Sequence, residues 1–453
     1  MRRYFGVFAV VFAVVLVAIL PVFSQDVSLT VYNQNRALVR EVRPMTMNPG
    51  TSVVSFTDVA ALIDPTSVHF KSTTTQDKLS VLEQNYEYDL VGPQKILEKY
   101  VDQDIRLVTD KGEIMSGKLL SASSEDVVVQ DDKGGIRIVK GKSIQNFDFP
   151  KLPDGLITKP TLVWQIENTG PKNQNVEVSY LTSGINWHAE YVAVADPLDK
   201  QIGLSGWVSI ENRSGSTYKN AKLKLVAGDV NVVQEGPIRA FAEDRVLAKA
   251  ASVPQFEEKS FFEYHLYTLS RKATVKDNQT KQISLFPLTQ TPVQKLFLYD
   301  GASNGEKVRV QLEFKNSKKD GLGMPLPKGK IRVYKEDTDG SLEFVGEDMI
   351  DHTPLDEKVR IYLGNAFDLV GERVQKSTSQ LSNRSREEEY EITLRNHKKE
   401  AVEIVVSERF WGNWKLLKNS SSFTKKDART AEFKIPVPAN GEAVLAYTVL
   451  LSW

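Results

Sequence analysis

The densest group of side chains that could bind a metal lies in the run GEDMIDH, residues 346–352. Carboxylates this close together in sequence could hold Ca²⁺, which prefers oxygen donors. The same run would suit a charged turn between two strands, and this is the preferred interpretation. An EF-hand loop starting at Asp337 would need glycine sixth and glutamate twelfth, but Leu342 and Asp348 stand there. The alternative metal ligands are Glu347, Asp348, Asp351 and His352.

Tryptophan side chains form a second candidate site. Aromatic rings on a β-surface can stack on sugar rings, so exposed tryptophans would point to carbohydrate binding. Alternation along a strand buries one face, however, and buried aromatic rings belong to the core. Core placement is the preferred interpretation for most of these rings. The candidate ligand-binding residues are Trp187, Trp207, Trp411 and Trp414.

The sequence contains no recognisable catalytic motif. Its five histidines do not occur at metal-binding spacings, and neither a GxSxG nucleophile elbow nor a Walker loop is present. The absence of cysteine excludes thiolate catalysis, disulfides and cysteine-ligated metals. We therefore expect no cofactor and no enzymatic activity. A glycoside hydrolase stays an open alternative, because its two carboxylates need to meet only in three dimensions.

Length and charge restrict the possible partners. A chain of 453 residues is expected to form about two to four domains, since one hydrophobic core rarely serves so many residues. The 58 basic and 58 acidic residues cancel, so no overall charge attracts nucleic acid or anionic lipid. Nucleic acid is therefore not an expected partner.

The first residues have the features of an export signal. Arg2 and Arg3 precede an apolar run, residues 5–20, which Pro21 ends. A small residue, Ser24, then stands at the expected cleavage position, so residues 1–24 are predicted to be a cleaved signal peptide. A retained membrane anchor is the alternative, because the run approaches the roughly 20 residues that cross a bilayer. Both interpretations place the rest of the chain outside the cytoplasm, in the periplasm or secreted.

Alternation of apolar and polar residues dominates the chain and predicts strands with one buried face. Residues 25–91 form the first expected β-domain. Residues 92–150 contain several short strand patterns after a helix near residues 94–100, which favours a small barrel of the SH3 or Sm type. Prolines then mark a linker at Pro150, Pro153 and Pro160.

The remaining sequence predicts two more β-domains. Residues 151–300 form a central one, interrupted at 237–258 by a stretch expected to be a mobile loop. Residues 301–453 show the cleanest alternation and predict an immunoglobulin-like sandwich. The expected fold is mainly β, with serial β-sandwich domains and a small barrel inserted after the first. Asn-x-Ser/Thr sequences, which suit surface loops, occur at Asn212, Asn278, Asn383 and Asn419.

Long strings in the second half of the chain carry a family resemblance. They are SYLTSGINWHAEYVAVAD (179–196), GWVSIENRSGSTYKNAKLKLVAGDVN (206–231), FEYHLYTLSRKATVKDNQTKQISLF (262–286) and GKIRVYKEDTDGSLEFVGEDMIDHTPLDEKVRIYLGNAFDLVGER (329–373). In this order they resemble the bacterial family of the domain of unknown function 4139, over roughly residues 160–453. Residues 27–68 look like the amino-terminal partner domain often found with it.

The resemblance implies an exported, mostly β protein. Some relatives are labelled mucoidy inhibitor-like, which points to the cell envelope or surface polysaccharide. The resemblance implies no activity and no catalytic residues. Some relatives carry a coiled coil between the two parts, where this chain has the small barrel-like segment.

Three functional hypotheses follow. The first is a non-enzymatic envelope protein that binds or scaffolds other macromolecules, because β-sandwiches present loops and strand edges to partners. The second is a carbohydrate-binding protein that acts on surface polysaccharide or peptidoglycan through the tryptophans. A hydrolase whose site assembles only in three dimensions is a distant third. The expected partner is an envelope protein or a glycan, and membrane contact is expected only through an uncleaved amino-terminal segment.

Overall fold

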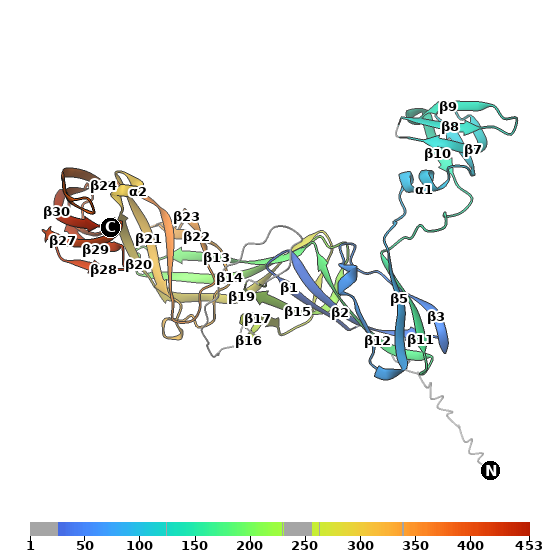
Figure 1. The fold of residues 1–453 in the computed structure, drawn as a ribbon, viewed down its shortest axis with the longest axis horizontal. Coiled ribbons are helices and arrows are strands. Elements are labelled where there is room, and N and C mark those ends of the chain that lie inside the picture. The colour runs from blue at the N-terminus through green and yellow to red at the C-terminus, as the bar shows by residue number, and fades with distance from the viewer. Residues whose placement is uncertain (1–25, 124, 229, 231–255, 262, 338) are drawn as a thin grey trace, which may run out of the picture. The chain divides into compact units, whose positions relative to one another are not determined.

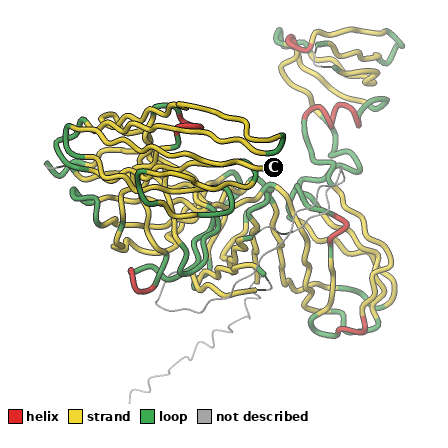
Figure 2. Tube along the Cα trace, turned by 60° about the vertical axis from the view of Figure 1, so that its left-hand side comes forward, coloured by secondary structure: helices red, strands yellow, loops and turns green. Residues whose placement is uncertain are grey.

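The structure is a computed structural model that describes residues 26–123, 125–228, 230, 256–261, 263–337 and 339–453. Strands joined by turns make up most of it, and helices are short, as the yellow and red segments of Figure 2 show. The prediction of a mainly β fold is therefore confirmed. Among the described residues, no helix is long and apolar enough to cross a membrane. The export segment with Ser24 lies outside the described residues, as does the expected mobile loop up to residue 255.

Two compact units make up the chain, and they are interleaved in sequence. Of the described residues, unit 1 comprises those within 26–27, 40–57 and 68–179, and unit 2 those within 28–39, 58–67 and 180–453. This division differs from the predicted amino-terminal domain ending at residue 91. The reason is that alternation specifies which face of a strand is buried but not which strand lies beside it.

The first strand illustrates the interleaving (Figure 1). β1 (Asp26–Tyr32) pairs in parallel with β15 (Tyr218–Ala227), and Leu29 lies opposite Leu223. The eight-stranded sheet has the order β16-β17-β15-β1-β2-β12-β4, with β18 paired to β15. Its other strands are β2 (Arg36–Thr46), β4 (His69–Ser72), β12 (Asn173–Ser183), β16 (Phe256–Phe261), β17 (Tyr264–Leu269) and β18 (Ala273–Val275). Parallel strands need a long connection, so no local sequence pattern could reveal the β1–β15 pair.

Unit 1 contains a three-stranded sheet with the order β3-β11-β5. The strands are β3 (Gly50–Thr57), β11 (Thr161–Asn168) and β5 (Leu79–Glu87). Trp164 at the centre of β11 is fully buried, and its ring centroid lies 4.4 Å from that of Phe70. Its Nε1 donates to Gln84 Oε1 at 2.8 Å, so the one polar atom of the indole also has a partner.

A small sheet in unit 1 corresponds to the predicted barrel. It follows α1 (Pro93–Lys99), which confirms the predicted helix, and has the order β10-β6-β7-β8-β9. The ladders of the described residues do not join the edge strands β9 and β10, so the sheet is open where the sequence predicted a small barrel of the SH3 or Sm type. Strand patterns reveal the number of strands, whereas closure depends on their tilt and stagger. The strands are β6 (Asp104–Thr109), β7 (Ile114–Ala122), β8 (Asp126–Gln130), β9 (Ile136–Lys140) and β10 (Ile144–Asp148).

Unit 2 contains a five-stranded sheet with the order β19-β14-β13-β22-β23. β13 and β22 are parallel neighbours, and the other pairs are antiparallel. Gly329 begins β22, where a Cβ atom would lie 2.1 Å from Ala189 O, so the close approach of the two strands requires glycine. The strands are β13 (Ile185–Ala195), β14 (Gln201–Asn212), β19 (Gln279–Pro292), β22 (Gly329–Glu336) and β23 (Leu342–Ile350).

The carboxyl-terminal part of unit 2 is a nine-stranded sheet with the order β27-β30-β25-β24-β21-β20-β26-β29-β28. Strands far apart in this order pack face to face, because Phe433 of β29 stacks on Tyr447 of β30 with ring centroids 5.8 Å apart. The sheet therefore folds over its own core, as the predicted sandwich requires. The strands are β20 (Gln294–Tyr299), β21 (Lys307–Lys315), β24 (Lys358–Ser382), β25 (Ser385–Asn396), β26 (Val402–Arg409), β27 (Asn413–Asn419), β28 (Phe423–Lys425), β29 (Thr430–Val437) and β30 (Gly441–Ser452), with α2 (Gly301–Asn304) after β20.

Buried asparagines close four strand ends. Each is at most 1% exposed, and its side-chain NH₂ group donates to backbone carbonyls of the turns around it. Asn396, for example, donates to Glu400 O at 2.8 Å and to Pro438 O at 2.9 Å. Without these donors, the carbonyls would be buried unpaired. The four residues, at or just after the ends of β11, β14, β21 and β25, are Asn168, Asn212, Asn316 and Asn396.

The burial of Asn212 corrects one expectation from the sequence. Its Asn-x-Ser sequence predicted a surface loop, but the side chain is 0% exposed and donates to Ser216 O at 2.9 Å and Lys276 O at 3.0 Å. The other three Asn-x-Ser/Thr residues are exposed, as expected. Because the tripeptide reports only local sequence, it does not distinguish a surface asparagine from one that closes a turn.

Replacing Asn396 with alanine should lower the free energy of unfolding by about 3 kcal/mol, because buried carbonyls lose their donors. Urea denaturation of the purified chain would measure this as an earlier transition of the carboxyl-terminal sandwich. Asn383→Ala, at the exposed tip of the β24–β25 hairpin, is the matched control and should change stability by about 0.5 kcal/mol or less. Equal effects of the two substitutions would contradict the role given to Asn396.

Candidate functional site

Trp187, a candidate ligand-binding residue, lies in the core of unit 2. It is 2% exposed on β13, and its Nε1 donates to Val226 O at 3.1 Å. Its ring centroid lies 6.2 Å from that of Tyr267 in an edge-on arrangement. The indole is thus fully used in packing, so Trp187 is a structural residue.

Trp207 lies on the outer face of the same five-stranded sheet and is 41% exposed. Its neighbour across the ladder is Glu190, which accepts hydrogen bonds from Ser209 Oγ and Gln282 Nε2, both at 2.8 Å. Burial opposes ionisation of Glu190, but the Ser209 hydrogen bond and nearby positive charges outweigh it and lower its pKa. His188 Nε2 lies 3.8 Å from Glu190. Since the serine donates to the carboxylate and not to the imidazole, this group is not a catalytic triad.

The four alternative metal ligands do not converge. Glu347 pairs with Lys330 at 3.3 Å and with Arg332 at 3.4 Å, whereas Asp348 accepts from the backbone N–H of Tyr362 at 2.7 Å. The two acids are adjacent on β23, where successive side chains point to opposite faces. Asp351 and His352 follow the strand, and His352 accepts from the backbone N–H of Lys328 at 3.1 Å. Within the described ranges, no three His, Asp or Glu residues gather as metal ligands.

The strongest cluster of ionisable groups lies inside the carboxyl-terminal sandwich. Glu408, which is 1% exposed, accepts hydrogen bonds from Arg373 and from the hydroxyl of Tyr447. The guanidinium of Arg373 lies 3.8 Å from the ring centroid of Tyr390. Burial, together with the charge of Glu408, raises the pKa of Tyr447 well above its ordinary value and that of Tyr299 to about 12. These groups link strands β24, β26 and β30, so they help to hold the sandwich together.

Two of the predicted tryptophans, Trp411 and Trp414, lie near the end of β30, which Trp453 follows. Trp411 is 72% exposed in the turn before β27, and Trp453 at the end of the chain is 59% exposed. The turn packs against the last strand, because a Cβ atom on Gly412 would lie 2.6 Å from Ser452 O. Trp414 is partly buried, and its Nε1 donates to Ala428 O at 2.8 Å.

Each of these tryptophans lies beside a cation. The guanidinium of Arg429 is 5.6 Å from the ring centroid of Trp411, Lys425 Nζ is 4.9 Å from that of Trp414, and the guanidinium of Arg386 is 5.8 Å from that of Trp453. Cations at these distances are attracted by the electron-rich faces of the rings. We call this group the aromatic–basic end: Trp411, Trp414, Trp453, Arg386, Lys425 and Arg429.

The surrounding sequence is strongly basic. Residues 409–429 contain six lysine and arginine residues and one acidic residue, Asp427, although the whole chain is neutral. The carboxylate of Asp427 accepts a hydrogen bond from the backbone N–H of Arg429 at 2.7 Å, so one of its oxygens is already paired within the turn. The aromatic–basic end therefore presents two exposed indoles, Trp411 and Trp453, next to positive charge, while Trp414 packs against the core. Such a surface can stack on a flat apolar ring and pair with an anion at the same time.

The sequence analysis found only part of this site. The run at 410–414 identified Trp411 and Trp414, but Trp453 and Arg386 join from the distant strands β30 and β25. The charge bias of residues 409–429 was the sequence signal that could have located the cations. Trp207 and Trp187 lie on other strands and do not contribute to the aromatic–basic end.

Comparison with known proteins adds one match. The model of a family described as a domain of unknown function (DUF4139) matches residues 176–453. The matched range contains the five-stranded sheet of unit 2 and the whole carboxyl-terminal sandwich with its aromatic–basic end. A search of curated proteins finds no match.

The different burial of the tryptophans should separate their effects on stability. Trp187→Ala should cost about 3–5 kcal/mol of unfolding free energy, because it leaves a large cavity and an unpaired carbonyl. Trp411→Ala should change stability by about 0.5 kcal/mol or less, because most of its ring faces solvent. Thermal denaturation of both variants beside the unaltered chain measures this difference. A large loss for Trp411→Ala would mean that its ring is structural.

Proposed function

The chain belongs to the family of the domain of unknown function DUF4139, and from this premise we propose that it is a non-enzymatic protein of the cell envelope that binds an anionic polysaccharide. The binding surface is the aromatic–basic end of the carboxyl-terminal sandwich. The single observation that carries the proposal is that Trp411 is 72% exposed while Arg429 lies 5.6 Å from its ring centroid. An indole exposed to this extent is available to stack on a ligand.

The chemistry of the site favours an acidic sugar chain over other ligands. The faces of sugar rings carry C–H groups that pack on indole, while carboxylate, sulfate or phosphate substituents pair with arginine and lysine. Two exposed tryptophans at one end of a sandwich, Trp411 and Trp453, can contact more than one sugar unit, which suits a polymer. Individual contacts of this kind are weak, so repeated units along the polymer increase the overall affinity.

The location in the envelope rests on the amino-terminal sequence. Arg2 and Arg3, the apolar run at 5–20 and Ser24 together support export. The complete lack of cysteine is compatible with that location. Polysaccharide is abundant there and nucleic acid is not, so the basic surface is assigned to the former.

A second candidate function, scaffolding of an envelope protein, is favoured by a different surface. The outer face of the five-stranded sheet carries several large apolar side chains that are more than 40% exposed, at Trp207, Leu288, Phe344 and Met349. Exposed apolar side chains near one another are typical of protein interfaces.

Affinity electrophoresis in gels that contain alginate, with dextran as the neutral polymer, tests the main proposal. The intact chain should be retarded by alginate and not by dextran, and the retardation should weaken as salt is added. Trp411→Ala should weaken binding about tenfold, which corresponds to about 1.4 kcal/mol of lost contact. Arg429→Gln should weaken it and flatten its salt dependence.

Trp207→Ala is the matched control, because it removes an exposed indole from another sheet. It should bind alginate as the intact chain does. Equal retardation by dextran, or normal alginate binding by Trp411→Ala, would exclude the aromatic–basic end as the polysaccharide site. Loss of binding only in Trp207→Ala would move the site to the outer face of the five-stranded sheet.

The proposed location has its own test. Protein isolated from the envelope fraction of expressing bacteria should begin at Gln25, because the signal peptide is cut after Ser24. Intact-mass spectrometry measures this directly. Recovery of the full-length chain from the cytosol would contradict export, whereas full-length chain in the membrane fraction would indicate a retained anchor.

A further inference from the structure

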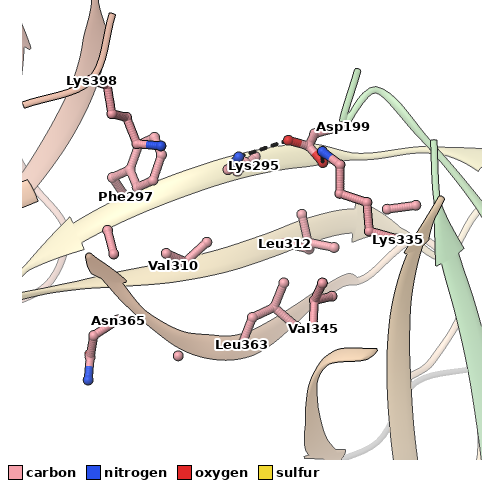
Figure 3. Close-up of a pocket in the computed structure, with 13 residues that line it drawn as sticks. Asp199, Lys295, Phe297, Val310, Leu312, Lys335, Val345, Leu363, Asn365 and Lys398 are labelled. Atoms are coloured by element: carbon pink, nitrogen blue, oxygen red, sulfur yellow. Dashed lines mark hydrogen bonds and ion pairs between the residues drawn. The ribbon is translucent and has the colours of Figure 1, made fainter. Parts of the chain in front are cut away.

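An open pocket lies in unit 2 between the five-stranded sheet and the carboxyl-terminal sheet, with a volume of about 240 Å³ (Figure 3). Its floor is apolar and comes from both sheets. Val310 and Leu312 of β21 and Leu363 of β24 come from one sheet, and Val345 of β23 comes from the other. These side chains are apolar yet line a space open to solvent, which is the usual composition of a ligand site.

Two β-bulges build this floor. Leu363 falls between Tyr362 and Gly364, which pair with consecutive residues of β21, so Leu363 has no partner in the ladder. Val345 is left out in the same way between Phe344 and Gly346 in the β22–β23 ladder. A bulge redirects one side chain out of the regular alternation, and bulges concentrate next to binding sites.

Each bulged residue is followed by a glycine that makes its position possible. Gly346 has φ +156° and Gly364 has φ +142°, and side chains other than that of glycine rarely tolerate such values. At Gly346 a Cβ atom would also lie 2.7 Å from Leu363 O. Glycine makes these backbone conformations accessible, and Val345 and Leu363 both line the pocket (Figure 3).

Positive charge is held at the rim. Asp199, in the turn between β13 and β14, accepts hydrogen bonds from Lys295 at 2.8 Å and from Lys335 at 2.6 Å, as Figure 3 shows for Lys295. Burial opposes ionisation of Asp199, but these two lysines outweigh it and lower its pKa, so the carboxylate stays charged at neutral pH. It fixes two flexible ammonium groups in place.

A third ammonium completes the rim. Lys398 Nζ lies 5.8 Å from the ring centroid of Phe297, and Lys295 Nζ lies 5.6 Å from the same ring. The residues that line the pocket thus include three lysines and one carboxylate, Asp199. A pocket with an apolar floor and an excess of cations at its rim fits a molecule with the opposite arrangement of charge.

We propose that this pocket binds a small amphipathic anion, a carboxylate or phosphate on an aliphatic or aromatic body. The body lies on Val310, Leu312, Val345 and Leu363, and the anionic group pairs with Lys398 and Lys295. The volume suits a short chain and not a polymer. The site is therefore separate in ligand and in place from the aromatic–basic end.

Isothermal titration calorimetry of the full chain tests the site with decanoate and with hexyl phosphate. At least one of these anions should bind with one molecule per chain, and the two arms distinguish a carboxylate from a phosphate head group. Decyltrimethylammonium, which has a similar tail and the opposite charge, should not bind. Absence of binding by both anions, or equal binding of the cation, would overturn the proposal.

Two variants locate the bound anion. Lys398→Gln should weaken binding about tenfold through loss of a charged contact, while Lys399→Gln, at the next and exposed residue, should have no effect. Val345→Phe, which fills the floor, should abolish binding while the melting temperature shows that the chain is folded. Unchanged binding in both Lys398→Gln and Val345→Phe would overturn the assignment of the anion to this pocket.

Discussion

The ends of buried strands impose the constraint on which the rest of this structure depends. Where the chain leaves a sheet, backbone carbonyls point into turns that water does not reach, and each needs a donor. Asn168, Asn212, Asn316 and Asn396 supply that donor from their side-chain NH₂ groups. Three of their side-chain oxygens also accept from the backbone N–H two residues later. These asparagine side chains therefore stabilise the turns that connect one strand to the next.

Both proposed sites lie on structure that these turns and the buried core hold in place. The turn closed by Asn396 carries Lys398, because the side-chain oxygen of Asn396 accepts from the Lys398 backbone N–H at 2.9 Å. At the other site, the exposed Trp411 is presented by a turn that packs against β30. Inside the sandwich, Glu408 and its partners link strands that are distant in sequence. Ligand contacts are therefore made by a few exposed side chains on a rigid support.

The candidate site shows how much of a binding site can be predicted from local sequence. The run at 410–414 pointed to Trp411, which is exposed, but Trp187 was an equal candidate from the sequence and lies in the core. A period of two predicts that one face is buried without stating which face carries the ligand. The pocket lysines come from three separate strands and turns, so no spacing in the sequence indicated them. The acidic run at 346–352 suggested a metal site because its carboxylates are close in sequence. They do not converge in the structure, because neighbours along a strand point to opposite faces.

The sequence by itself determined that the chain is mainly β, where most strands and the one helix of the small sheet lie, and which family it belongs to. Those properties depend on local periodicity and on long matching strings, both of which are present in the sequence. The tertiary structure alone decided that β1 pairs with β15, that the small sheet is open, that Asn212 is buried, and that Val345 and Leu363 meet. Each of these depends on contacts between residues far apart in the chain. A strand carries the same alternation whichever partner it hydrogen-bonds with, so the pairing is fixed only when all the cores form together.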